Sequence, residues 1–208
     1  MSRKLAKGCL LLFVLFCRAA IAQDVPKQQV SYESMVERVK GGDKTVDFRQ
    51  LRLAYMDSTT YSNAPDTDPQ KKAMMAALNS KDFAGAIKDA DIVLASNFVD
   101  MDAHFVEYIA YREQNAPDKA EFHKFVFQAL VKSITDSGDG KTPETAFQVI
   151  LVHEEYVLLR FMGFGMPGEQ SLFKKNSHSY DEMKCEDPKS GKPVTFYFNV
   201  DIPIKHGI

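Results

Sequence analysis

The chain of 208 residues contains no tryptophan, and it is poor in cysteine, with three, and in proline, with nine. So few cysteines exclude the disulfide framework of a small cysteine-rich protein, and 11 glycines with nine prolines exclude a collagen-like or low-complexity chain. There is no excess of basic side chains either, because 26 Lys and Arg face 28 Asp and Glu. We therefore expect no nucleic-acid partner, since such a partner calls for a basic face. The remaining composition, 45% hydrophobic and 11% aromatic, is typical of one globular domain.

The chain also lacks a hydrophobic run of the roughly 20 residues that a membrane-spanning helix needs. The apolar run at 8–17 is half that length, follows Arg3, Lys4 and Lys7, and is followed by Ala20-Ile21-Ala22. This order is typical of a secretory signal peptide, which we predict over residues 1–22. An uncleaved anchor is the alternative, and the short run disfavours it. The protein is thus expected to be exported, periplasmic or secreted, in a bacterium, with no stable membrane insertion after cleavage.

Removal of residues 1–22 would change the net charge and the cysteine content of the mature protein. The mature chain would begin near Gln23 and carry 22 basic against 28 acidic side chains, a net charge of −6. Only Cys185 would remain of the three cysteines, so an intramolecular disulfide is excluded. This cysteine could pair between chains, but a lone cysteine is more often a small, semi-buried hydrophobic residue.

Helical signals dominate residues 31–135, after a flexible segment at 23–30. Ser31, Asp47, Asp68 and Asp82 each precede a helical apolar pattern and are suited to cap a helix start, and Pro69 and Pro117 are suited to a first helical turn. Residues 57–69 are polar and rich in turn formers, which predicts a connection. A unit at about 67–100, with Phe83 and Ala86 at its aromatic and small positions, resembles a degenerate tetratricopeptide repeat of the usual 34-residue spacing. An ordinary helix bundle with hairpins of similar length is the alternative.

Residues 136–208 have a different character. Residues 149–152 form a compact β-branched run, and 154–162 read as a helix that ends at Gly163. Residues 171–173, 180–185 and 194–200 are strand candidates, and the last two alternate around a turn-rich loop, as in a hairpin. We therefore predict an α+β fold, in which tetratricopeptide-like helical hairpins are followed by a small antiparallel β-sheet packed on the helices. The two regions would form a single domain.

The order of these segments resembles a bacterial family known as domain of unknown function 4919. The resemblance covers about 30–202 and rests on the segments 47–55 (DFRQLRLAY), 83–104, 137–147 (SGDGKTPETAF), 154–160 (EEYVLLR), 170–172, 180–181 and 197–200. It implies an exported, mostly bacterial protein without an assigned activity. No catalytic residue is carried over, because the family supplies none.

Several catalytic and binding motifs fail on their spacing. Residues 140–142 read Gly-Lys-Thr, but a phosphate-binding loop needs glycine where Thr135 stands, and a strand rather than a helix before it. A calcium-binding loop counted from Asp136 would need side-chain oxygen ligands where Gly138, Gly140 and Phe147 stand, so this motif is not matched. No Gly-x-Ser-x-Gly motif occurs, so the nucleophile turn of a serine hydrolase is not indicated. The adjacent acids at 154 and 155 would diverge by about 100° on a helix, so they cannot flank one bond as the acid pair of a glycosidase does. The sequence thus predicts no catalytic residue, no metal site and no cofactor.

The remaining candidates lie on two successive helices. His104, Glu107, Tyr108 and Tyr111 fall on the first helix and His123 on the next, and we take these five as a candidate ligand-binding set. Antiparallel pairing around residue 116 would leave His104 a turn or more, about 7 Å, from His123. Hydrogen-bonded histidines between helices are therefore favoured over a His–Glu–His metal site.

These features favour a protein-interaction or envelope-assembly module with a protein or peptide partner. Aromatic residues on the helices, among them Tyr61 and Phe105, could hold a peptide or could simply pack in the core. The alternative function is a metal-assisted or carboxylate hydrolase of the periplasm that uses His104, Glu107 and His123. Whether the protein is an enzyme is left open, with the non-enzymatic reading favoured.

Overall fold

The computed structural model describes residues 30–207, so the predicted signal peptide lies outside the described residues. Helices come first: α1 Tyr32–Lys40, α2 Phe48–Met56, α3 Thr59–Ser62, α4 Asp68–Asn79, α5 Phe83–Ser96, α6 Met101–Glu113 and α7 Pro117–Thr135. A mixed region follows: the 3-10 helix η1 Pro143–Thr145, β1 Phe147–Gln148, α8 His153–Phe161, β2 Glu169–Lys175, β3 His178–Glu186, β4 Pro193–Asn199 and α9 Asp201–Lys205. The predicted α+β class is confirmed.

Short polar side chains fix the starts of three helices, as predicted. The side chain of Ser31 accepts a hydrogen bond from the backbone N–H of Ser34, that of Asp47 from Arg49, and that of Asp82 from Gly85. Each cap satisfies a backbone donor that the first turn of a helix would leave free. The caps therefore fix the residue at which each of these helices begins.

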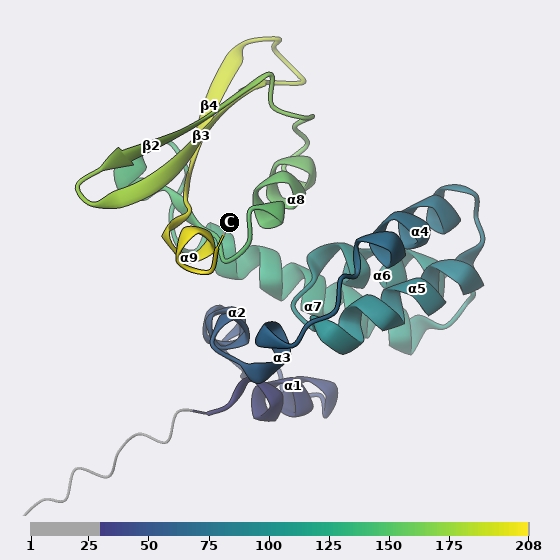
Figure 1. The fold of residues 1–208 in the computed structure, drawn as a ribbon. Coiled ribbons are helices and arrows are strands. Elements are labelled where there is room, and N and C mark those ends of the chain that lie inside the picture. Colours follow the sequence, from purple (N-terminus) through teal and green to yellow (C-terminus); the bar gives the residue numbers. More distant parts are fainter. Residues whose placement is uncertain (1–29, 208) are drawn as a thin grey trace, which may run out of the picture.

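Helices α4, α5, α6 and α7 pack in succession and form the group on the right of Figure 1. Small buried side chains, including Ala86, Ala90, Ala103 and Ala110, lie between α4, α5 and α6 and allow close approach of the backbones. Such neighbour-to-neighbour packing is what helical hairpins require. The tetratricopeptide-like arrangement itself stays a prediction.

Helix α7 connects the two parts of the molecule. Its first half packs on α6, and Figure 1 shows its second half running between α2 below and the sheet above. Leu130 and Ile134 of this second half are fully buried in the main core. They share that core with Leu51 of α2, Met183 of β3 and Phe198 of β4.

The sheet has the strand order β1-β4-β3-β2. Strands β2, β3 and β4 are antiparallel, as predicted, but the two-residue strand β1 pairs in parallel with β4, Phe147 opposite Phe198. The sheet is therefore mixed rather than purely antiparallel, and the edge opposite β2 is formed by β1, the first strand in the sequence. Cys185 is buried in β3 beside the core, and its free thiol has a pKa raised by burial.

Two local predictions need correction, and the β-branched run at 149–152 lies in the loop that leads from β1 into α8. The polar connection 57–69 contains the short helix α3, which Ser58 caps through the N–H of Tyr61. Asp68 lies inside α4 and does not cap it.

Among residues 30–207, no helix combines the length and the hydrophobicity that crossing a bilayer requires.

Candidate ligand-binding pocket between helices α5, α6 and α7

Three of the five candidate residues lie on one face of α6. Asp100 caps this helix by accepting a hydrogen bond from the N–H of Ala103, which fixes where the first turn begins. His104, Glu107 and Tyr111 follow at intervals of three and four residues, the spacing that places side chains above one another on a helix. That face is turned toward α7, which carries His123 in its second turn.

Hydrogen bonds link the imidazoles and the carboxyl group into one chain. The Nδ1 atoms of His104 and His123 lie 3.0 Å apart, and His104 Nε2 lies 2.8 Å from the carbonyl oxygen of Phe98. On the other side, His123 Nε2 lies 2.8 Å from Glu107 Oε2. The chain thus runs from the backbone of the α5–α6 connection, through both histidines, to a carboxyl group of α6.

These partners determine where the protons lie. A carbonyl oxygen only accepts, so His104 Nε2 carries a proton and donates it to Phe98. Burial, reinforced by the charge of His123, lowers the pKa of His104 from 6.5 to about 3, so this imidazole is neutral and its Nδ1 is an acceptor. His123 must then donate through Nδ1. A further proton lies between His123 Nε2 and Glu107 Oε2, because otherwise two acceptors would face each other there.

Glu107 is left with more acceptor capacity than the protein fills. The residue is 1% exposed, and its Oε1 has no hydrogen-bond donor within the part of the chain that the structure describes. Burial raises the pKa of the Glu107 carboxyl, the bond with His123 lowers it, and the nearby carboxylate of Asp91 on α5 raises it again. The carboxyl group of Asp91 therefore lies near that of Glu107, and among residues 30–207 His123 is the one hydrogen-bond partner of the Glu107 side chain.

A pocket of about 500 Å³ opens over this pair of carboxyl groups. Its inner wall includes Glu107 and His123, whose side chains are 1% and 13% exposed. The other lining residues are Lys40, Asp91, Leu94, Ala95, Phe98, Tyr111, Asp118, Lys119 and Phe122. The pocket thus has a rim of exposed charged side chains, among them Asp91, aromatic walls, and one buried carboxyl group, that of Glu107, at its floor.

The aromatic walls already accept cations from the protein itself. The ammonium group of Lys119 lies 4.8 Å from the ring centre of Tyr111, and that of Lys40 lies 5.6 Å from the ring centre of Phe98. The ring of Tyr111 also stacks on His123, with 5.6 Å between the centroids. An aromatic face that attracts an ammonium group attracts other cations in the same way.

The structure brings four of the five candidate residues together and leaves one apart. His104, Glu107, Tyr111 and His123 meet as described, whereas Tyr108 lies outside the pocket, its ring under Arg112 and Lys124. The expected separation of about 7 Å between the two histidines is wrong. The expected 7 Å counts only the rise along the helix and leaves out the reach of the side chains, whose Nδ1 atoms lie 3.0 Å apart.

Sequence reasoning identified Tyr111 among the aromatic walls, but it did not identify Phe98, Phe122 or the second acid, Asp91. Phe98 lies in a connection and contributes through its carbonyl group, for which no sequence signal exists. Phe122 and Lys119 lie in a sequence pattern that many surface helices share, so nothing marks them as pocket residues. Asp91 lines the pocket only because α5 packs beside α6. Phe105 and Tyr61, the other aromatic candidates, pack instead against Phe127 and Tyr55.

Within residues 30–207, no group of three or more His, Cys, Asp and Glu side chains is arranged to hold a metal ion. The hydrogen-bond chain gives the physical reason at this site. The lone pair of His104 Nδ1 receives the proton of His123, and His104 Nε2 carries its own. Neither nitrogen of His104 is available to a metal while the chain is intact.

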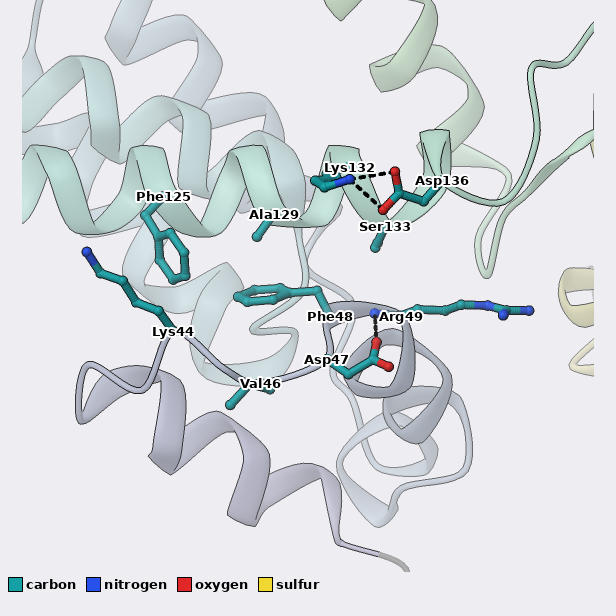
Figure 2. A pocket seen from close by; sticks show the side chains of 10 residues that line it. All are labelled: Lys44, Val46, Asp47, Phe48, Arg49, Phe125, Ala129, Lys132, Ser133 and Asp136. Carbon is teal, nitrogen blue, oxygen red and sulfur yellow. Dashed lines mark hydrogen bonds and ion pairs between the residues drawn. The ribbon is translucent and has the colours of Figure 1, made fainter.

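A second pocket, of about 460 Å³, lies between residues 44–49 and α7 (Figure 2). The rings of Phe48 and Phe125 meet edge to face at one end, and at the other end Lys132 binds Asp136 at 2.6 Å. Asp47 is occupied as the cap of α2. The polar groups of this pocket are thus largely paired with one another or exposed to water, so it offers less to a ligand than the acidic floor beside His123.

The two adjacent acids of α8, Glu154 and Glu155, lie away from both pockets. Glu154 forms a buried ion pair with Arg52, which also contacts Ser133 and the carbonyl group of Gln148. Glu155 is fully buried, and within the described residues neither of its carboxyl oxygens has a hydrogen-bond partner; the carboxyl group of Asp181 on β3 lies near it.

Comparison with known proteins gives one match. A family model described as a domain of unknown function (DUF4919) matches residues 19–207. Neither a curated protein nor a solved structure matches the chain.

Proposed function

The chain belongs to the domain of unknown function 4919 family, as its sequence resemblance predicted, and from that premise we propose that it is a binding module for a basic side chain of a protein partner. The proposed site is the pocket between α5, α6 and α7. The proposed ligand group is an arginine guanidinium or a lysine ammonium group presented by a peptide segment.

The observation that carries the proposal is the unfilled acceptor at the pocket floor. Within residues 30–207 the buried Glu107 Oε1 has no hydrogen-bond donor, and the carboxyl group of Asp91 lies near Glu107. A buried acceptor left unpaired costs about 1–3 kcal/mol, which a donor from a ligand would recover. A guanidinium group carries five N–H donors and binds carboxyl groups through two bonds at once.

The walls of the pocket favour the same ligand class. Phe98 and Tyr111 present faces that Lys40 and Lys119 already cover. Both lysines are exposed at the rim and have long, flexible side chains, so an incoming cation could displace their ammonium groups. The net charge of −6 predicted for the mature chain would also attract a basic partner.

The hydrolase alternative fits this geometry less well. Metal-assisted hydrolysis at His104, Glu107 and His123 would require these groups to give up their mutual hydrogen bonds. Stoichiometric zinc in protein purified without a histidine tag would favour this alternative.

Titration calorimetry tests the binding proposal. The probes are a capped tripeptide Gly-Arg-Gly, its lysine counterpart, and a norleucine counterpart that keeps the length but removes the charge. We expect the two basic peptides to bind and Glu107→Gln to weaken binding at least about tenfold, the effect of losing a charge-assisted hydrogen bond.

A matched control comes from the same helix. Glu113 is exposed and paired with Arg112, away from the pocket, so Glu113→Gln changes the net charge equally without touching the floor. Equal affinities for the two variants, or equal binding of the norleucine peptide, would contradict the proposal. Circular dichroism establishes that both variants are folded.

We also propose that the protein is exported and that residues 1–22 are removed. The support is the sequence pattern of positive residues, a short apolar run and an Ala-x-Ala site. Mass spectrometry of the protein recovered from its host tests this, with a mature chain that begins near Gln23 as the expected result.

A further inference from the structure

Strand β2 has one neighbour in the sheet. The order β1-β4-β3-β2 places it at the edge, where it pairs with β3 alone among the described residues, and Figure 1 shows no element beyond it. The strand is seven residues long and almost wholly exposed, and Leu172 at its centre is 63% exposed. An open edge of this kind presents backbone N–H and C=O groups to another strand.

The turn that follows β2 shows which peptide groups point outward. Asn176 and Ser177 form a two-residue loop with φ of 50° and 68°, the conformation of a type I′ turn. In such a hairpin the closing pair, Lys175 with His178, exchanges backbone hydrogen bonds across the strands. Since successive residues direct these groups to opposite sides, Gln170, Leu172 and Lys174 direct theirs away from β3.

We propose that β2 pairs antiparallel with β2 of a second copy of this chain, around a two-fold axis at Leu172. In this register Leu172 faces its own counterpart, and the outward peptide groups of residues 170, 172 and 174 meet those of 174, 172 and 170. Glu169 of each copy then lies opposite Lys175 of the other. The two sheets would join into one continuous sheet.

Charge complementarity selects this register over its neighbours. An axis at Lys174 would place that lysine opposite its counterpart, and axes at residues 171 or 173 would place no opposite charges face to face. Like charges directly opposite one another are unfavourable, and opposite charges are favourable. The register at Leu172 also covers the most exposed apolar side chain of the strand.

The charged residues of this register have partners within the chain that they can exchange. Lys175 lies 2.6 Å from Glu144, and Glu169 Oε2 lies 2.7 Å from Lys184 Nζ, in pairs whose side chains are about half exposed or more. Exposed ion pairs contribute little and re-form readily. They therefore leave both residues able to face a second copy.

Sedimentation over a range of protein concentrations tests the pairing through a charge swap. Glu169→Lys and Lys175→Glu each create two like-charge contacts per dimer and should weaken association about threefold to tenfold. The double variant, E169K with K175E, restores opposite charges and should associate nearly as well as the parent. Lys189→Glu, in the exposed loop between β3 and β4, changes the net charge without touching β2 and should have no such effect.

Each alternative outcome is decisive. A parent protein that stays monomeric at every concentration reached would overturn the proposal, as would a double variant no better than the single ones. Leu172→Pro supplies an independent measurement, because proline removes an outward N–H that β3 does not use. We expect this variant to be folded and monomeric, and a dimer that persists in it would place the contact elsewhere.

Discussion

His104 and His123 share a hydrogen bond of 3.0 Å between their Nδ1 atoms, and the backbone of Phe98 decides its direction. Because that carbonyl group takes the proton of His104 Nε2, His104 accepts and His123 donates. His123, which lines the pocket, is thereby held with its Nδ1 proton directed at a fully buried neighbour. This relationship leads to the first of four predictions.

His104 should remain neutral well below the pH at which histidine usually charges. Its pKa is lowered to about 3, so between that value and 6.5 the unfolded chain binds a proton that the folded chain does not. This contribution to the free energy of unfolding is complete above 6.5 and is lost as the pH falls toward 3. Nitrogen NMR of the imidazoles checks it, and a His104 signal that titrates near pH 6.5 would contradict it.

Glu155→Gln should stabilise the protein at alkaline pH. Burial, with the neighbouring charge of Asp181, raises the pKa of Glu155 from 4.5 to about 9. The folded chain therefore holds a proton that the unfolded chain releases, so stability declines as the pH rises from 4.5 to 9. Glutamine supplies a permanent donor to Asp181 and removes this decline.

Urea unfolding at about pH 5 and pH 8 measures the effect of Glu155→Gln, and a gain of about 1 kcal/mol or more at the higher pH is expected. Glu121→Gln, at an exposed position of α7, serves as the control with no such pH dependence. Parallel pH profiles for the parent and the Glu155 variant would show that Glu155 is ionised in the folded chain.

Arg52→Met should destabilise the protein by about 3–5 kcal/mol, because it leaves Glu154 buried without its cation. The matched control is Arg49→Met on the same helix. Arg49 is exposed and donates to the side chain of Gln148 at 2.9 Å, so its loss should cost no more than about 1 kcal/mol. Similar free energies of unfolding for the two variants would contradict a structural role for the buried pair.

Gly140→Ala should be more harmful than Gly163→Ala. Both glycines have positive φ, 67° and 89°, so each alanine pays about 1–2 kcal/mol of backbone strain. An added methyl group meets nothing within 4 Å at Gly163, but at Gly140 it overlaps the buried ring of Phe147. We expect a further loss of about 1–3 kcal/mol at Gly140, measured by thermal or urea unfolding. Equal losses would mean that the ring moves aside freely.

Features that depend on neighbouring residues could be predicted from the sequence. The caps at Ser31, Asp47 and Asp82 and the turn at Gly163 each follow from a few adjacent side chains. The hairpin of β3 and β4 follows in the same way from alternation around a polar loop.

Features that depend on distant residues could not be predicted. The pairing of Phe147 with Phe198, and the burial of Arg52 against Glu154, join segments about 50 and 100 residues apart, and no local pattern encodes them. At the pocket, the spacing of His104, Glu107 and Tyr111 on α6 was readable. Their meeting with His123 depends on how α6 and α7 cross, and the role of Asp91 depends on the packing of α5.

The parallel pairing of β1 with β4 has a consequence for folding during synthesis. Strand β1 follows the helices directly, yet its partner is the last strand of the chain. As the chain emerges from the ribosome, the helices can assemble early, whereas the partner strand of Phe147 is missing until residues 193–199 have been synthesised. Closing the sheet is therefore a late event, and a chain that stops short of β4 would leave Phe147 without its partner strand and would expose the side of α7 that faces the sheet.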